Sequence, residues 1–187
     1  IEKTFGFLNV EHTNKDEYLK LKGKGEIDIS SLLEIDFQNK YRILKVNEND
    51  DGFKILLVEE TSDLIVYYID VIKVSDWLFE GKAVTQVLLW RTTDYKHIEA
   101  TQGVANKVFE KLLIPEYKIV ISDDSQTING KDFWKRQLTR AIQLGLFVYR
   151  YDRLNTLATQ ITDPKKILDE SADLWGTGEE YVNILGM

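Results

Sequence analysis

The chain contains no cysteine and only two prolines among its 187 residues. The absence of cysteine excludes disulfide bonds, thiol catalysis and cysteine-ligated zinc sites. No uninterrupted apolar run is long enough to cross a bilayer. The first residues, IEKTFGFLNV, also lack the basic start and apolar core of a secretory signal. The sequence therefore predicts a cytoplasmic protein without a membrane-spanning segment.

An excess of basic residues is also missing. The 31 Asp and Glu residues outnumber the 24 Lys and Arg residues, which gives a formal net charge of −7. A nucleic-acid-binding protein normally carries a basic surface, because phosphate neutralisation supplies most of its non-specific affinity. The densest basic segment, KDFWKRQLTR at residues 131–140, is interpreted as the solvated face of a helix. The composition therefore argues against nucleic acid and favours a basic protein as a partner.

Runs rich in β-branched and aromatic residues predict four strands, at residues 41–46, 53–60, 64–74 and 84–91. Short polar turns separate the first three, which is typical of an antiparallel meander. Two further strands are predicted after residue 117, on either side of a helix, and a short one at 181–185. Strands come first and helices alternate with strands later, which predicts the α/β class in its mixed α+β form.

Apolar residues at helical spacing predict helices at residues 100–113 and 131–144, ended by Pro115 and Gly145. Asp163 followed by Pro164 predicts another helix start. Two shorter helices are expected at residues 14–22 and 29–35. With no linker of low complexity, the chain is predicted to be a single domain over residues 1–187 with a helical extension from about residue 154.

This order of elements resembles the fold of the GCN5-related N-acetyltransferase (GNAT) family. That fold has two N-terminal helices, an antiparallel meander, a helix leading into a strand, another helix, and closing strands. The resemblance covers residues 41–152. The segment ISDDSQTINGKDFW, followed later by DLWG, is similar to segments of uncharacterised GNAT-like proteins encoded by bacteriophages. A chain of phage origin would act in the host cytoplasm.

In the GNAT family, the pyrophosphate of acetyl-CoA binds backbone amides at the start of the helix after the fourth strand, at the signature R/Q-x-x-G-x-G/A. The corresponding segment here is ATQGVA, in which Gly103 and Ala105 fit the small positions. Ala100 stands where the family has Arg or Gln. The residues that the resemblance assigns to the acetyl-CoA cofactor are Leu89, Arg91, Gln102, Gly103, Val104 and Ala105.

The family's catalytic residues are matched less well. Its general acid is a tyrosine four residues before a Gly-Phe pair, and Ala141 occupies that position relative to Gly145. A general base for the accepting amine is often Glu or Asp acting through water. By position the candidates are Glu99, Asp94 and Glu59, and Glu99 is equally explained as an acid at a helix N-terminus.

Two other polar groups have alternative interpretations. Residues 122–125, Ser-Asp-Asp-Ser, follow a buried strand and have the oxygen ligands that a divalent metal prefers. A turn closed by these side chains is the favoured interpretation, so no metal site is predicted. His97 is either a base or a surface loop histidine. The segment WLF at residues 77–79 lies in a connector and is a candidate for an exposed tip that binds a protein partner.

Two functions follow from these observations. The first is acetyl-CoA-dependent transfer of an acyl group to an amine. The second is a catalytically inactive GNAT-fold protein that acts by protein–protein interaction, for instance by inhibiting a host or defence factor. The alanines at positions 100 and 141 favour the second function, and the GNAT-like order of elements is common to both.

Overall fold

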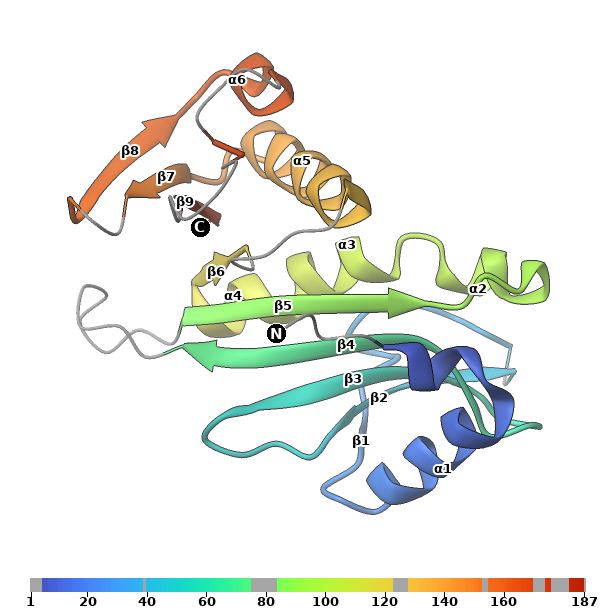
Figure 1. Ribbon diagram of the computed structural model, residues 1–187. Coiled ribbons are helices and arrows are strands. Elements are labelled where there is room, and N and C mark those ends of the chain that lie inside the picture. Colours follow the sequence, from blue (N-terminus) through green and yellow to red (C-terminus); the bar gives the residue numbers. More distant parts are fainter. Residues whose placement is uncertain are drawn as a thin grey trace. The chain divides into compact units, whose positions relative to one another are not determined.

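The computed structural model describes residues 5–38, 40–74, 84–122, 128–152, 155–169, 174–175 and 182–186 (Figure 1). The chain forms two compact units. The first contains Ile1–Val74 and Val87–Glu116, and the second contains Ser75–Gln86 and Tyr117–Met187. The chain therefore changes unit between residues 74 and 75, 86 and 87, and 116 and 117.

A sheet with the strand order β1-β2-β3-β4-β5 is the basis of the first unit. Strands β1 to β4 pair antiparallel, and β5 follows β4 in the order. The bounds are β1 (Ile27–Asp28), β2 (Tyr41–Val46), β3 (Gly52–Glu59), β4 (Leu64–Val74) and β5 (Val84–Arg91). The four predicted strands are confirmed, because their β-branched and aromatic side chains suit a buried pleated surface.

One face of this sheet is covered by the N-terminal segment. It comprises a short 3-10 helix, η1 (Gly6–Asn9), and helix α1 (Glu11–Leu21), which confirms the first expected helix. Tyr18 and Leu21 of α1 pack in one buried cluster with alternate strand residues such as Leu44 and Leu56. Trp90 of β5 packs against the same cluster. This face is therefore the α1 side of the sheet.

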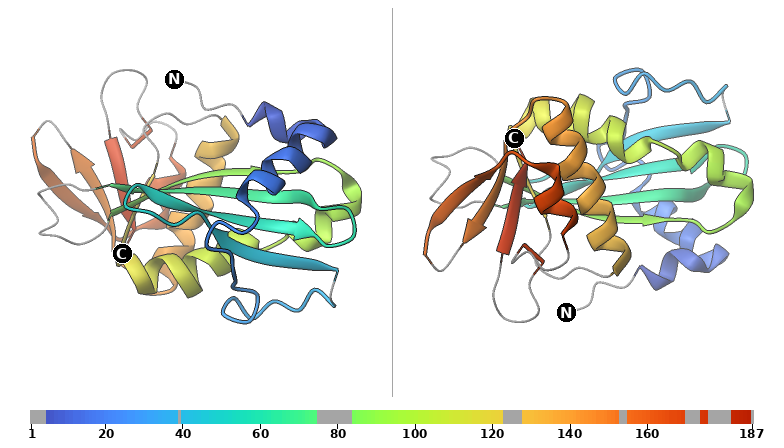
Figure 2. Two further views of the ribbon diagram at one scale, coloured as in Figure 1. Left: turned by 90° about the horizontal axis from the view of Figure 1, so that it is seen from below. Right: turned by 90° about the horizontal axis from the view of Figure 1, so that it is seen from above.

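The opposite face is covered by the segment after β5, as Figure 2 shows for the first unit. This segment contains η3 (Tyr95–His97), α2 (Ile98–Thr101), α3 (Val104–Val108), the π-helical turn η4 (Phe109–Leu113) and α4 (Ile114–Tyr117). The predicted uninterrupted helix over 100–113 is wrong, because Gly103 adopts φ 71° and separates α2 from α3. Pro115 does not end the helix either, since it lies in the first turn of α4.

The helix expected at residues 29–35 is also wrong. The segment from Ser30 to Glu34 is a hydrogen-bonded turn. The side chain of Asp28 accepts a bond from Ser30 N at 2.9 Å, and Ser30 Oγ accepts one from Ile43 N at 3.1 Å. Glu34 has φ 54°, which is outside the right-handed helical region. Short polar side chains that bind the backbone compete with helix formation in this way.

The second unit contains a sheet with the order β5-β6-β9-β7-β8. The first residues of β5 pair in parallel with β6 (Ile119–Ile121), and the other neighbours pair antiparallel. The remaining bounds are β7 (Val148–Asp152), β8 (Leu157–Ile161) and β9 (Val182–Gly186). Strand β9 agrees with the expected closing strand, whereas β8 was not expected from the sequence. The last strand of the chain thus lies between β6 and β7.

Two helices accompany this sheet, α5 (Ile128–Gln143) and α6 (Pro164–Leu168). The predicted end of α5 at Gly145 and the predicted start of α6 at Asp163 are both confirmed. Gly145 has φ 77°, and the amides of Gly145 and Leu146 donate to the carbonyls of Ile142 and Ala141 after the last turn of α5. The Asp163 side chain accepts a bond from Lys165 N at the start of α6.

The structure confirms a mixed α+β protein with an antiparallel meander followed by alternating helices and strands. In the part of the chain that the structure describes, no helix is long and apolar enough to cross a membrane. The predicted WLF tip at residues 77–79 lies outside the described residues, as do residues 123–125 of the Ser-Asp-Asp-Ser group.

Candidate functional site

The candidate cofactor segment lies in the first unit, where α2 ends and the next helix begins. Gly103 is the N-terminal cap of α3, and its carbonyl accepts the first helical bond, from Lys107 N at 3.1 Å. From Val104 the helical chain continues through η4 and α4 to Tyr117. The first amides of a helix have no partner within the helix and carry the positive end of its dipole. The amides from Gly103 onward are thus placed where an anion is stabilised.

The surroundings of Gly103 are open on one side. A Cβ atom added at Gly103 would meet no other atom within 4 Å. Gln102 and Gly103 are exposed, whereas the side chains of Val104 and Ala105 are buried in the unit. The side chains after Gly103 therefore anchor the helix, and the backbone at Gln102 and Gly103 faces solvent. Ala100, where the signature has Arg or Gln, is half-buried in α2.

The two assigned strand residues lie on the same face of β5. Trp90 packs on the α1 side of the sheet. Because side chains alternate along a strand, Leu89 and Arg91 lie on the other side, which α2 to α4 cover (Figure 2). Leu89 is half-buried and Arg91 is exposed. The pairing of β5 with β6 covers residues 84–86, before these two positions are reached.

Two of the candidate bases, Asp94 and Glu99, lie at the starts of helices, and the third, Glu59, lies at the end of a strand. Asp94 Oδ1 accepts a bond from Lys96 N at 3.0 Å and so caps η3. Its other oxygen, Oδ2, lies 4.0 Å from His97 Nε2. Glu99 lies exposed in the first turn of α2, which is the position of a dipole-stabilising acid. Glu59 of β3 accepts a bond from Ser62 Oγ at 2.6 Å and pairs with Lys40.

A buried pair formed by Tyr41 and His97 lies on the side of the sheet that α2 to α4 cover. The sequence did not predict this pair. Tyr41 Oη lies 2.9 Å from His97 Nδ1, and the two rings meet edge to face. His97 is only 6% exposed, so the interpretation as a surface loop histidine is wrong. The pair joins β2 to the segment immediately before α2. It therefore fixes the start of the segment that carries Gly103.

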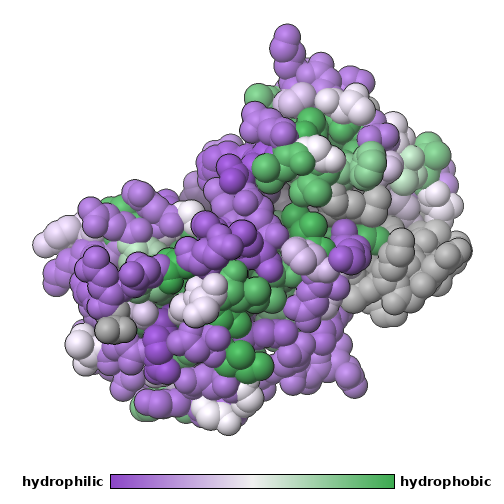
Figure 3. Space-filling view, turned by 180° about the vertical axis from the view of Figure 1, so that it is seen from behind, coloured by the Kyte–Doolittle hydropathy of each residue, from purple (hydrophilic) through white to green (hydrophobic). Residues whose placement is uncertain are grey.

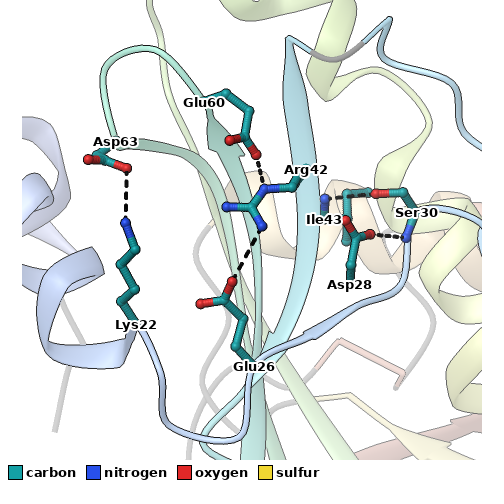
Figure 4. A network of polar contacts seen from close by, with 8 residues as sticks. All are labelled: Lys22, Glu26, Asp28, Ser30, Arg42, Ile43, Glu60 and Asp63. Atoms are coloured by element: carbon teal, nitrogen blue, oxygen red, sulfur yellow. Dashed lines mark hydrogen bonds and ion pairs between the residues drawn. The ribbon is translucent and has the colours of Figure 1, made fainter.

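A polar network of the first unit surrounds Arg42 of β2 (Figure 4). Its guanidinium bonds Glu60 through Nε and Glu26 through a terminal nitrogen at 3.5 Å. Near this network, Lys22 Nζ lies 3.8 Å from Asp63 Oδ1 and forms a separate ion pair. Burial raises the pKa of the nearby Tyr18 hydroxyl above its usual value. Each of these cations is paired with a carboxylate of the protein, which indicates a structural network rather than a site for a ligand.

In the second unit, the positions singled out from the sequence, Ala141, Gly145 and Ser122, are buried or cap a helix. Ala141, at the place of the family's tyrosine, is buried in α5, and Gly145 caps that helix. Tyr149 is half-buried and Tyr151 is buried in β7. Ser122, after β6, is buried. No group of three or more potential metal ligands occurs among the described residues.

Comparison of the sequence with protein-family models gave no match, and comparison with curated proteins gave no relative.

Proposed function

We propose that this chain is an acetyltransferase-like protein of the GNAT type, and that it binds acetyl-CoA at the segment from Gln102 to Ala105. The observation that supports the proposal most directly is the helix start at Gly103. A left-handed glycine, exposed on one side, places successive amides at the positive end of a buried helix. A pyrophosphate group is the anion that such a group of amides would bind.

The order of elements also supports this proposal. The antiparallel meander β2–β3–β4–β5 is followed by the α2–α4 segment, β6, α5 and closing strands. This is the order expected of the GNAT fold. In the proposed complex, the amides around Gly103 hold the pyrophosphate. The pantetheine arm lies along β5 near Leu89 and Arg91, beyond the residues that pair with β6.

Calorimetric titration with acetyl-CoA and with CoA tests the cofactor site. In Gly103→Glu, the new carboxylate would occupy the open space and repel the pyrophosphate. Gly23→Glu is a matched control, because Gly23 also has positive φ (80°) and no atom within 4 Å of an added Cβ. We expect a Kd on the order of micromolar for the native chain and for Gly23→Glu, and no binding for Gly103→Glu. Absence of binding to the native chain at millimolar ligand would overturn the proposal.

The second candidate function is a catalytically inactive protein that binds another protein, such as a host or defence factor. It is favoured by Asp94, whose carboxylate caps η3, and by Ala141, which provides no general acid. An assay of CoA release with amine acceptors separates the two candidates. Binding of acetyl-CoA without any release supports the inactive protein, and release that depends on Gly103 supports the enzyme.

A further inference from the structure

Strand β8 (Leu157–Ile161) forms an open edge of the second unit's sheet. It pairs with β7 on one side and is last in the strand order, so within the described ranges no strand pairs with its other side (Figure 1). Its first four residues are exposed. Because neighbouring side chains on a strand point to opposite faces, these exposed residues include side chains of both faces. Among the residues that the structure describes, β8 therefore has an unpaired edge, and its first four side chains are exposed.

Within its five residues, which read LATQI, β8 has no charge, proline or bulge to protect this edge. Natural edge strands are usually protected by charge, proline, bulges or short length. Strand β1, the edge of the other unit's sheet, shows this protection. It has two residues, contains Asp28 and directly follows Glu26.

We propose that β8 is a self-association edge, which pairs antiparallel with β8 of a second copy of this chain about a two-fold axis. An axis at Thr159 places Leu157 opposite the partner's Ile161, and Ala158 opposite the partner's Gln160. Just beyond the strand, Thr156 meets the partner's Thr162 and Asn155 meets the partner's Asp163. No two like charges are opposed in this register. The unpaired backbone N–H groups of one copy can donate to the unpaired carbonyls of the other.

A second copy is the occupant that this edge fits, because the uncharged strand LATQI can pair with itself about Thr159 without opposing like charges. Two-fold symmetry requires only that the strand be complementary to itself. The contact is small compared with the roughly 1,200–2,000 Å² of a stable interface. The dimer should consequently be weak and should dissociate on dilution.

Sedimentation equilibrium with charged variants at Thr159 tests this assignment. Because Thr159 is exposed, Lys or Glu at this position should leave the fold intact. At the axis, however, each substitution opposes two like charges. We expect the native chain to dimerise at about 1 mM, and we expect each variant alone to have a dimer Kd about tenfold higher or more. An equimolar mixture of Thr159→Lys and Thr159→Glu should restore the dimer, because opposite charges then meet.

The control variant is Thr93→Lys, which makes the same change at an exposed threonine of the first unit. It should dimerise like the native chain. Rescue in the mixture would support the two-fold register at Thr159, because a change that merely disturbed folding would not be reversed. A native chain that is monomeric throughout, or a dimer unaffected by Thr159→Lys, would overturn the proposal. Pairing of this edge only with an extended segment of another protein would also overturn it.

Discussion

Tyr41 and His97 are each other's partners in the interior of the first unit, with 2.9 Å between Oη and Nδ1. Tyr41→Phe keeps the ring and removes the hydroxyl, which leaves a buried imidazole nitrogen without this partner. We expect the free energy of unfolding to fall by about 1–3 kcal/mol, measured by urea denaturation. Tyr95→Phe is the control, because Tyr95 is 77% exposed. Equal stability of the two variants would contradict the assigned role.

Tyr68 of β4 gives the stability of the first unit a dependence on alkaline pH. It is 3% exposed, and burial, helped by Asp70 and Glu17, raises the pKa of its hydroxyl far above its usual value. Between the unfolded pKa of about 10 and this higher folded pKa, the unfolded chain releases a proton that the folded chain retains. Stability is therefore fully present below pH 10 and falls as pH rises, by about 1.4 kcal/mol per pH unit for one such group.

Tyr68→Phe should make this alkaline loss of stability shallower, as followed by urea denaturation at a series of pH values. Tyr95→Phe removes a tyrosine hydroxyl from a side chain that is 77% exposed, so it serves as the control and should leave the slope unchanged. Tyr18 also has a raised pKa, so part of the slope should remain in Tyr68→Phe. An unchanged slope in Tyr68→Phe would show that Tyr68 is not the group responsible.

At the scale of elements, the contact of α1 with β4 depends on Asn14. Its side-chain amide donates to the carbonyls of Ile65 at 2.9 Å and Leu8 at 3.0 Å, and its oxygen accepts from Ile65 N at 2.8 Å. Asn14→Leu leaves three buried backbone groups without these bonds. We expect a loss of about 3 kcal/mol or more in the free energy of unfolding. Asp16→Leu, at an exposed position of the same helix, should change it far less.

The elements that could be predicted are those whose signals are local. The β-branched runs of β2, β4 and β5 and the caps at Gly145 and Asp163 act within a few residues, so the sequence alone was sufficient. The break at Gly103 was missed because the surrounding apolar periodicity continues across it. Strand β8 was missed because its exposed residues lack the alternation of a half-buried strand.

The candidate site shows the same limit. Gly103 could be singled out from a short motif, and Leu89 and Arg91 from their place on a predicted strand. The Tyr41–His97 pair could not, because its members are 56 residues apart in the chain and come together only through tertiary packing. The capping role of Asp94 was likewise hidden, since the sequence does not reveal that η3 begins there.

At the scale of the whole molecule, the acidic composition should control solubility. The chain has a net charge of −7 at pH 7 and a pI of about 5.0. Hydrophilic residues predominate on the face drawn in Figure 3. Because charge repulsion opposes association, solubility should be lowest near pH 5 and rise above it. The protein left in solution after equilibration from about pH 4 to about pH 8 measures this. A minimum near neutral pH would contradict it.

The division of β5 between the two units has a consequence for the order in which the chain emerges from the ribosome. Strands β2 to β4 are synthesised as one continuous segment and can pair early. The first unit is nevertheless incomplete until Glu116 has emerged, because α2 and α3 cover its second face. By then, residues 84–86 have emerged, but the residues of β6 with which they pair have not. Translation at about 5–20 residues per second therefore leaves the side of residues 84–86 that pairs with β6 without its partner for seconds.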